Sequence, residues 1–251
     1  MEQQQEHPII SVKNVSMMFN LNRDKVMGLK EYIIKTVQRK LFFDEFWALR
    51  DISFDVMKGE ILGVMGLNGS GKSTLLKLIA GVLKPTKGTI TVNGDVVPLL
   101  ELGTGFDYEF SAKENVFMNG AMFGHSLAHM ETLYNEIMDF AELWEFENVP
   151  LKNFSSGMSA RLGFAVATSV KPNILIIDEV LGVGDFRFME KCEARINDML
   201  SQGITVLIVS HNSETIENMC SRALLLRKGE LVMVGGVEEV SAVYQEGRVE
   251  P

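Results

Sequence analysis

The sequence has few cysteines, no long apolar run and no excess of positive charge. Two cysteines in 251 residues are too few for a disulfide framework, so we expect a reducing compartment. No run of about eighteen apolar residues occurs, which excludes a membrane-spanning helix. The net charge of −9 argues against nucleic acid as a partner, because nucleic-acid binding requires a basic surface. The polar, acidic start MEQQQEHPII is not that of a secretory signal, so any membrane part is expected from another subunit.

Short apolar segments alternate with helical segments along most of the chain. Strands are predicted at 9–19, twice within 46–66 around Lys58 and Gly59, and at 89–94, 173–178, 204–211 and, as a hairpin, 222–236. Helices are predicted at 72–83, 186–201 and 212–220, with a Met- and Phe-rich helical insertion over 112–170. Such alternation indicates an α/β fold with a parallel sheet.

A glycine-rich segment, GVMGLNGSGKST at 63–74, fits the phosphate-loop pattern G-x-x-x-x-G-K-[ST]. It lies between a predicted strand and a predicted helix, where backbone N–H groups and the helix N-terminus can bind phosphate. Lys72 would reach the β- and γ-phosphates, and the Ser73 hydroxyl would bind Mg²⁺. The candidate ATP-binding residues of this loop are Gly66, Leu67, Asn68, Gly69, Ser70, Gly71, Lys72, Ser73 and Thr74.

Two carboxylates end the apolar strand in ILIIDE at 174–179. Two ionised groups at the end of a buried strand are costly unless a cation offsets them. Asp178 is therefore predicted to hold Mg²⁺, directly or through water, and Glu179 to act as the general base toward the attacking water. Together with the phosphate loop, these residues predict hydrolysis of a nucleoside triphosphate with Mg²⁺.

The segment NFSSGMSARLGFAVA at 153–167 decides between the classes of phosphate-loop protein. Ser155, Ser156 and Gly157 come directly before a predicted helix, about twenty residues ahead of ILIIDE. Here the sequence resembles the ATP-binding cassette (ABC) family, whose signature is usually LSGGQ; the serine and second glycine match, whereas Ser156 and Met158 do not. The resemblance implies an ABC ATPase fold: a phosphate-loop core with a mostly parallel sheet, N-terminal antiparallel strands and a helical subdomain.

The same resemblance implies roles for further residues. Asp185 occupies the position of the family's D-loop aspartate, and His211 that of the switch histidine near the γ-phosphate. Phe19 matches the aromatic that stacks on adenine; core packing is the alternative for Phe19, and Trp47 is the substitute candidate. The family usually has a glutamine before the helical insertion, where this chain offers Glu101 as a further Mg²⁺ or water ligand.

Within the family, the sequence resembles the nucleotide-binding subunits of bacterial exporters of lipid-linked polysaccharides such as O-antigen or teichoic acid. Four segments carry the likeness: a basic insertion before EFWALRDISF, LLELGTGF, SSGMSARLGFAVA and DEVLGVGD. We expect one nucleotide-binding domain over 1–251, with a core at about 1–100 and 171–251 and a helical subdomain at about 101–170. Some members carry a C-terminal carbohydrate-binding domain, which this chain is expected to lack.

The insertion contains an amphipathic helix at about 26–43. Its apolar residues recur every fourth position, and residues 23–43 carry six basic and two acidic side chains, a net +4 in an acidic protein. A basic face suits anionic headgroups or an acidic membrane subunit. By resemblance it would lie near the lipid-linked glycan and act as a docking or gating helix; a surface helix packed on its own domain is the alternative.

The resemblance also implies an assembly. Two copies would enclose two ATP molecules between the phosphate loop of one and the signature of the other, beside a pair of integral membrane permease subunits at the cytoplasmic face of the membrane. Three alternatives are another ABC importer or exporter, a soluble ABC ATPase without a transport role, and a regulatory module that hydrolyses nothing. Both carboxylates of ILIIDE argue against the last of these.

Overall fold

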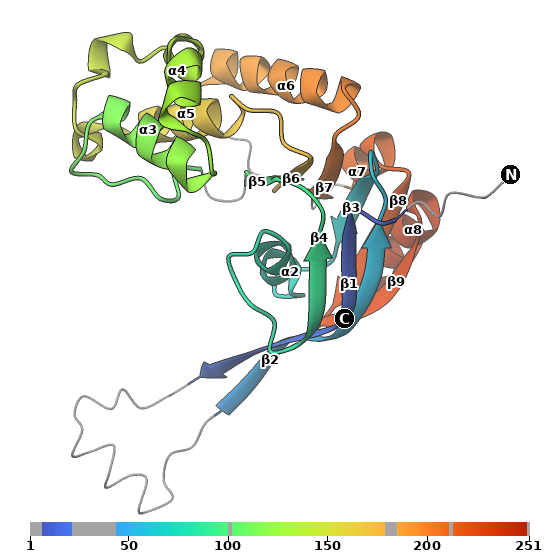
Figure 1. Ribbon diagram of the computed structural model, residues 1–251. Helices are drawn as coiled ribbons and strands as arrows, with labels where there is room; N and C mark the ends of the chain where they lie inside the picture. Colours follow the sequence, from blue (N-terminus) through green and yellow to red (C-terminus); the bar gives the residue numbers. More distant parts are fainter. Residues whose placement is uncertain (1–6, 22–43, 100–101, 179–184, 211–212, 250–251) are drawn as a thin grey trace, which may run out of the picture. The chain divides into compact units, whose positions relative to one another are not determined.

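The computed structural model describes residues 7–21, 44–99, 102–178, 185–210 and 213–249 (Figure 1). The chain divides into two compact units. The first comprises Met1–Val56, Val64–Asn93 and Arg222–Pro251; the second comprises Met57–Gly63 and Gly94–Ser221. The predicted helix at 26–43 lies outside the described residues, and the predicted core and helical subdomain stay predictions.

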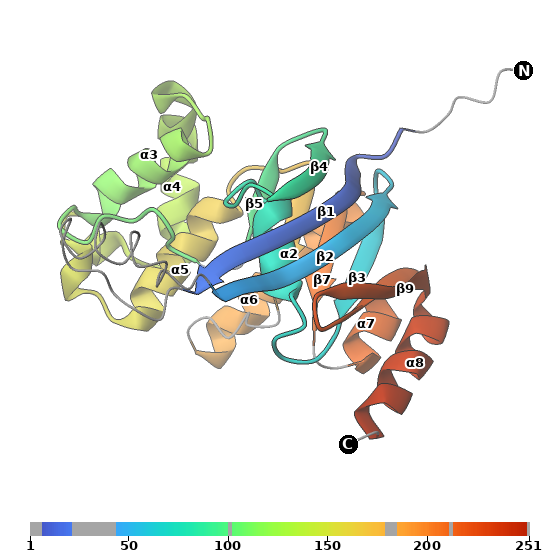
Figure 2. The same ribbon diagram turned by 90° about the horizontal axis from the view of Figure 1, so that it is seen from below.

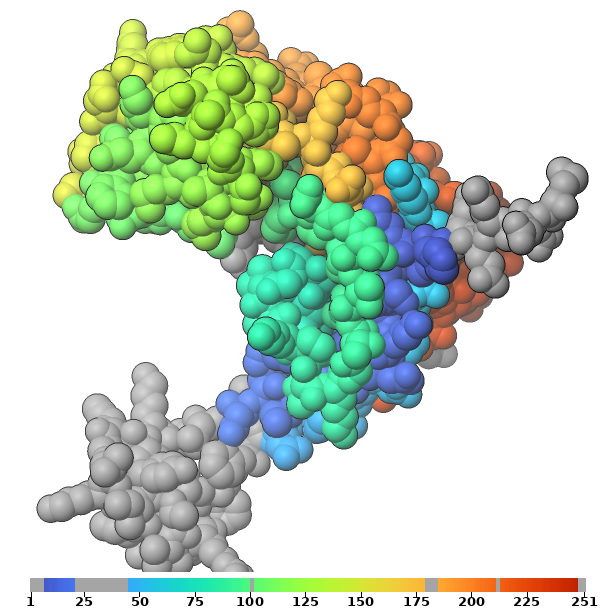
Figure 3. All heavy atoms as spheres, viewed as in Figure 1, coloured from blue at the N-terminus to red at the C-terminus, as the bar shows by residue number. Residues whose placement is uncertain are grey.

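Three antiparallel strands of the first unit form one sheet in the order β2-β1-β4, with bounds Ile10–Leu21 (β1), Asp44–Val56 (β2) and Lys87–Val92 (β4). The register of β1 shifts near Asn14, whose φ is 50°. Gly88 of β4 passes so close that a Cβ there would lie 2.3 Å from the Asn14 carbonyl oxygen. β4 is the edge strand of this sheet, and its close approach to β1 leaves no room for a side chain at Gly88. Figure 3 shows β4 on the surface beside β1.

A second sheet has six strands in the order β5-β6-β7-β3-β8-β9. Their bounds are Ile61–Met65 (β3), Val96–Pro98 (β5), Ile174–Ile177 (β6), Thr205–Val209 (β7), Arg222–Arg227 (β8) and Glu230–Gly236 (β9). β5, β6 and β7 pair in parallel, while β8 and β9 form an antiparallel hairpin. Every residue of β6 and β7 is buried, as expected for parallel strands covered on both faces.

In the described part of the first unit, the helices are α2 (Lys72–Ile79) and α8 (Val237–Val249). α8 packs along β8 and β9, and Figure 2 shows it beside β9. The second unit contains α3 (Ala112–Met122), α4 (Leu127–Ala141), α5 (Ser156–Ala167), α6 (Phe186–Ser201) and α7 (Ser213–Met219), with short 3₁₀ turns at Trp144–Phe146 and Leu151–Asn153. Ser111 and Glu114 form a capping box that fixes the start of α3. None of the helices in the described ranges is long and apolar enough to cross a membrane.

Three phenylalanines hold α4, α5 and α6 together. The rings of Phe140, Phe164 and Phe188 pack with centroid separations of 5.8, 5.6 and 6.5 Å, and all three side chains are buried. On α5, Gly163 lies against the backbone of the segment that precedes α3: a Cβ there would be 2.6 Å from the Gly103 nitrogen. The backbone of α5 therefore contacts that segment with no side chain between them.

The α/β fold predicted from the sequence is confirmed, and most predicted elements lie where their patterns placed them. The helix at 186–201 has the predicted bounds, and the hairpin turns at Lys228 and Gly229 as predicted. Among the described strands and α-helices, two were not predicted. β5 has three residues and is too short to leave a pattern, whereas α8 buries Val237, Val240 and Tyr244 at helical spacing.

Candidate functional site

The conformation of the loop between β3 and α2 depends on its glycines. Gly66, Gly69 and Gly71 have φ values of 150°, 77° and 106°, which side chains with a Cβ rarely adopt. A Cβ on Gly66 would lie 2.4 Å from the Leu226 carbonyl oxygen, and one on Gly71 would lie 2.7 Å from the Leu49 side chain. Glycine is therefore required at Gly66 and Gly71 by space as well as by backbone conformation.

The loop gathers positive charge and hydrogen-bond donors at the start of α2. Lys72 is 7% exposed, and its ammonium donates to the Gly66 carbonyl at 2.7 Å and the Leu67 carbonyl at 3.1 Å. Gly71 is the N-cap of α2; within the described chain no side chain caps this helix, and its first turn has no acidic residue. The N-terminus of α2 can therefore accept an anion beside the Lys72 ammonium.

One buried hydroxyl of the loop lacks a partner within the described residues. Ser70 is 4% exposed, and its Oγ has no hydrogen-bond partner there. Its backbone is in place, because its N–H donates to Leu67 and its carbonyl accepts from Gly229. Ser73 is exposed on the first turn of α2. A buried donor, an ammonium and an uncapped helix N-terminus fit a phosphate chain.

The candidate adenine contact lies near the end of β1. Phe19 is half-buried and pairs across the sheet with Phe46, which is 49% exposed. Trp47 has other contacts: its indole N–H donates to Glu45 at 3.3 Å, and the Lys87 ammonium lies 5.1 Å from its ring centroid. Phe19 therefore stays the predicted adenine contact, with Trp47 as the less suitable alternative.

In the second unit, the predicted signature residues form the start of α5. Ser155 is the N-cap, and its Oγ accepts the Met158 N–H at 3.2 Å. Ser156 and Gly157 form the first turn. These residues line a pocket of about 680 Å³ together with Glu142, Leu143, Phe146, Met158, Ala160, Arg161 and Asp185. The structure thus brings Asp185 to the same pocket as the signature, although about thirty residues separate them in the sequence.

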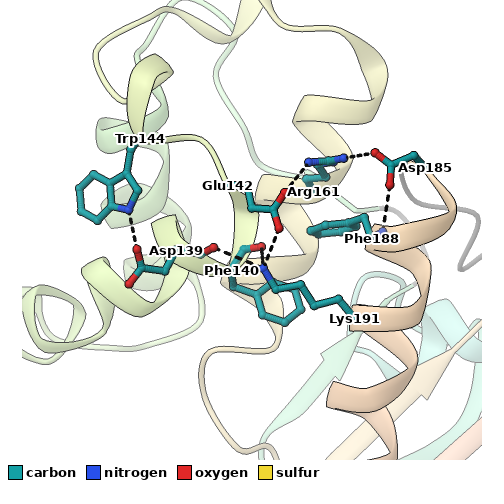
Figure 4. Close-up of polar contacts among 8 residues, drawn as sticks. All are labelled: Asp139, Phe140, Glu142, Trp144, Arg161, Asp185, Phe188 and Lys191. Atoms are coloured by element: carbon teal, nitrogen blue, oxygen red, sulfur yellow. Dashed lines mark hydrogen bonds and ion pairs between the residues drawn. The ribbon is translucent and has the colours of Figure 1, made fainter.

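A chain of ion pairs lies beside this pocket (Figure 4). Arg161 of α5 donates to Glu142 at 3.4 Å and also to Asp185. Asp185 is the N-cap of α6 and accepts the Phe188 N–H at 3.0 Å. That N–H, together with the weaker effect of the Arg161 charge, holds the pKa of Asp185 below its ordinary value, although desolvation opposes both. Glu142 and Arg161 were not among the predicted site residues, because no local sequence pattern marks their partners.

The remaining candidates are the carboxylates and the histidine. Asp178 directly follows β6, at the carboxyl end of the parallel strands, and is half-buried. Glu101, Glu179 and His211 lie outside the described residues, and their roles stay predictions. Within the described part of the chain, no three His, Cys, Asp or Glu side chains group closely enough to hold a metal ion.

The family model described as "ABC transporter" matches residues 49–182, which contain the phosphate loop, the start of α5 and Asp178. The chain belongs to the ABC transporter family. This confirms the family resemblance found in the sequence.

Curated relatives of this ABC cassette are similar to it in sequence over nearly its whole length. It is 43% identical over 239 residues to the ABC transporter protein AbcA of Aeromonas salmonicida, with 95% of this chain and 76% of AbcA covered. It is 41% identical to the O-antigen export system ATP-binding protein RfbB of Klebsiella pneumoniae, with 96% and 98% covered. It is 38% identical to the teichoic acids export ATP-binding protein TagH of Listeria monocytogenes, with 94% and 70% covered. The resemblance to the polysaccharide-exporter branch is thereby confirmed.

Solved structures support the fold of this ABC cassette. An ATP-binding subunit of an ABC transporter superposes with a TM-score of 0.70 at 22% identity, covering 94% of this chain and 93% of that one. The ATP-binding cassette MJ0796 bound to ADP and Pi superposes with a TM-score of 0.68 at 22% identity, covering 91% and 98%. The predicted ABC ATPase fold is confirmed.

Proposed function

We propose that this chain is the ATP-hydrolysing subunit that powers export of a lipid-linked polysaccharide across the cytoplasmic membrane. The observation that carries the proposal is the match of nearly the whole chain to ATP-binding proteins named for O-antigen and teichoic acid export. The loop around Lys72 supports the ATPase part, because it combines a buried ammonium, a buried hydroxyl and an uncapped helix N-terminus. Export of another cargo by the same cassette is the alternative.

Each predicted site residue would have a separate role in ATP hydrolysis. Lys72 and the loop backbone would hold the β- and γ-phosphates, and Glu179 would take a proton from the attacking water. His211 would contact the γ-phosphate. Ser73, Asp178 and Glu101 would hold Mg²⁺, which neutralises phosphate charge when bound.

Two copies of the chain would act together. One superposed structure, that of the cassette MJ0796, is a dimeric, post-hydrolysis state bound to ADP and phosphate. In the proposed homodimer, Ser155, Ser156, Gly157 and Asp185 of one copy would face the phosphates held by the other. ATP would then favour the closed dimer and hydrolysis would release it, which shifts the population of states. A pair of permease subunits would hold the dimer at the cytoplasmic face of the membrane.

The proposal is tested by identifying the molecule that is no longer exported when ATP hydrolysis is blocked. Cells that express only the Glu179→Gln form are extracted for glycans attached to a carrier lipid, beside cells with the wild-type protein. We expect a lipid-linked polymer to accumulate in the cytoplasm while that polymer disappears from the surface. Normal surface glycans without any accumulation would refute polysaccharide export and leave the ATPase assignment intact.

A second prediction concerns the segment 26–43, predicted from its sequence to be a helix, which we propose meets the anionic part of the lipid-linked glycan. Replacing Lys35, Arg39 and Lys40 by glutamate changes the charge of this segment by six units and should reduce export at least about tenfold, because the surface potential that attracts anions is reversed. ATP binding and basal ATPase activity should stay within about twofold, since none of the three residues belongs to the phosphate loop.

The matched control is the same reversal at Lys58, Lys84 and Lys171, three exposed lysines elsewhere on the fold. Export is measured as surface glycan per cell at equal protein level. An equal loss in both triple variants, or no loss in the first, would remove the helix from the export step.

A further inference from the structure

Arg161 lies on α5, six residues after Ser155, and its guanidinium reaches two carboxylates. Nη1 is 3.4 Å from Glu142 Oε2, and Nη2 donates to Asp185 Oδ2. The Arg161 side chain is only 19% exposed, although both carboxylates are largely open to solvent. Figure 4 shows the guanidinium between the end of α4 and the start of α6.

An aromatic ring lies beneath this guanidinium. Arg161 Cζ lies 4.7 Å from the ring centroid of Phe188, which is 2% exposed. The ring is held in the core, and the attraction between a guanidinium and an aromatic face restricts the movement of the Arg161 side chain. The two terminal nitrogens of the Arg161 guanidinium each reach one carboxylate, Nη1 that of Glu142 and Nη2 that of Asp185.

Asp185 uses its two oxygens for different partners. Oδ1 accepts the Phe188 N–H at 3.0 Å and so caps α6, while Oδ2 accepts from Arg161. The carboxylate is thus oriented from two sides, by the backbone of α6 and by the signature helix α5.

Glu142 completes the connection at the end of α4. It has a left-handed backbone, with φ 59° and ψ 44°, and it accepts from Lys191 of α6 at 3.2 Å as well as from Arg161. The Lys191 ammonium also donates to the Phe140 carbonyl at 2.8 Å, at the carboxyl end of α4. Three helices are tied by one network.

The position of this network matters more than its contribution to stability. Side-chain exposures of 48% for Glu142 and 63% for Asp185 mean that water screens these pairs, so each adds little to the free energy of folding. The network borders the pocket lined by Ser155, Ser156, Gly157 and Asp185. Its effect is therefore on the relative geometry of these pocket residues.

We infer that Arg161 is a positioning residue that holds the signature turn and Asp185 in one fixed arrangement, ready to meet nucleotide bound by the second copy. This inference rests on the proposed function, because it assumes that the pocket faces ATP in the dimer. Arg161 itself touches no reacting atom and acts through Asp185.

The first test compares Arg161→Met with Arg195→Met. Arg195 of α6 is a matched control: its guanidinium lies over a core ring, 4.7 Å from the centroid of Phe140, and pairs with Glu136 of α4 at 2.8 Å, but it lies nearly three helical turns beyond Asp185. We expect Arg161→Met to lower kcat at least about tenfold with ATP affinity of the monomer within about twofold, since small misplacement of reacting groups is costly. Arg195→Met should keep kcat within about twofold. Equal kcat losses in the two variants, or an unchanged kcat in Arg161→Met, would overturn the inference.

Arg161→Lys keeps the charge but loses the fork, so one ammonium cannot bridge Glu142 and Asp185 as the guanidinium does. Its kcat should fall between those of wild type and Arg161→Met. If Arg161→Met does not fold, Arg161→Lys carries the test alone, and wild-type kcat in that folded variant would contradict the inference.

A double-mutant cycle asks whether Arg161 acts through Asp185. On the Asp185→Asn background, Arg161→Met should lower kcat by no more than about twofold further, because the ion pair is already gone. Losses that multiply independently would show that Arg161 acts elsewhere.

Hydrogen exchange in nucleotide-free protein separates this inference from the proposed function. Arg161→Met should speed amide exchange at least about threefold both in the first turn of α6 and in the first turn of α5, while Arg195→Met should not. Unchanged exchange at both turns would refute the positioning role even if the wild-type protein hydrolyses ATP. A wild-type protein without ATPase activity would instead count against the proposed function. The exchange result would then still decide whether Arg161 holds the starts of α5 and α6 in place.

Discussion

Replacing Glu179 by glutamine is expected to slow ATP hydrolysis by about 100- to 10,000-fold, the range that a positioned general base contributes. Glutamine keeps the size of the side chain but cannot accept the proton of the attacking water. ATP binding by Lys72 and the glycine loop should persist, so the ATP-bound dimer should accumulate. Single-turnover hydrolysis and light scattering with ATP present measure the two effects.

Glu190→Gln is the control for lost negative charge, because Glu190 is exposed on α6 in the same unit. Its kcat should equal that of the wild type within about twofold, as expected for a surface substitution. A Glu179→Gln protein with near-normal turnover would remove Glu179 from the base role and direct attention to Asp178 or His211.

Replacing Lys72 by methionine should weaken ATP binding by about 10- to 150-fold, because a hydrogen bond to a charged group contributes about 1.5–3 kcal/mol. The stem of the side chain is kept, so packing at this buried position should change little. The Gly66 and Leu67 carbonyls lose the ammonium that they accept from, which should also lower the melting temperature slightly. Equilibrium titration with a fluorescent ATP analogue measures the affinity.

Lys84→Met makes the same change at an exposed lysine beyond the end of α2. It should leave the affinity within about twofold. Equal weakening by both variants would mean that overall charge, and not the contact of Lys72 with phosphate, sets the affinity.

The phosphate loop could be predicted residue by residue because its chemistry is local. Gly66 and Gly71 are required by backbone conformation and space, and Lys72 follows directly at the start of a helix. The bounds of α6 and the hairpin of β8 and β9 follow from periodicity and from turn residues in the same way.

The surroundings of Asp185 could not be predicted for the opposite reason. Arg161 is 24 residues away from it along the chain, and Glu142 is a further 19 away, so only the packing of α4, α5 and α6 brings them together. The helix α8 is a different case, since its buried residues already show helical spacing in the sequence. The predicted residues Glu101, Glu179 and His211 lie outside the described residues, and their roles stay predictions.

The contact between Gly163 and Gly103 has a mechanical consequence. A side chain between two segments can absorb a displacement by changing rotamer, but two backbones in direct contact cannot. Glycine inside a helix costs about 1 kcal/mol relative to alanine, so the neighbouring segment, and not the helix, sets the residue at this position. A displacement of the segment around Gly103 is therefore expected to displace α5 directly, because no side chain between the two backbones can absorb it.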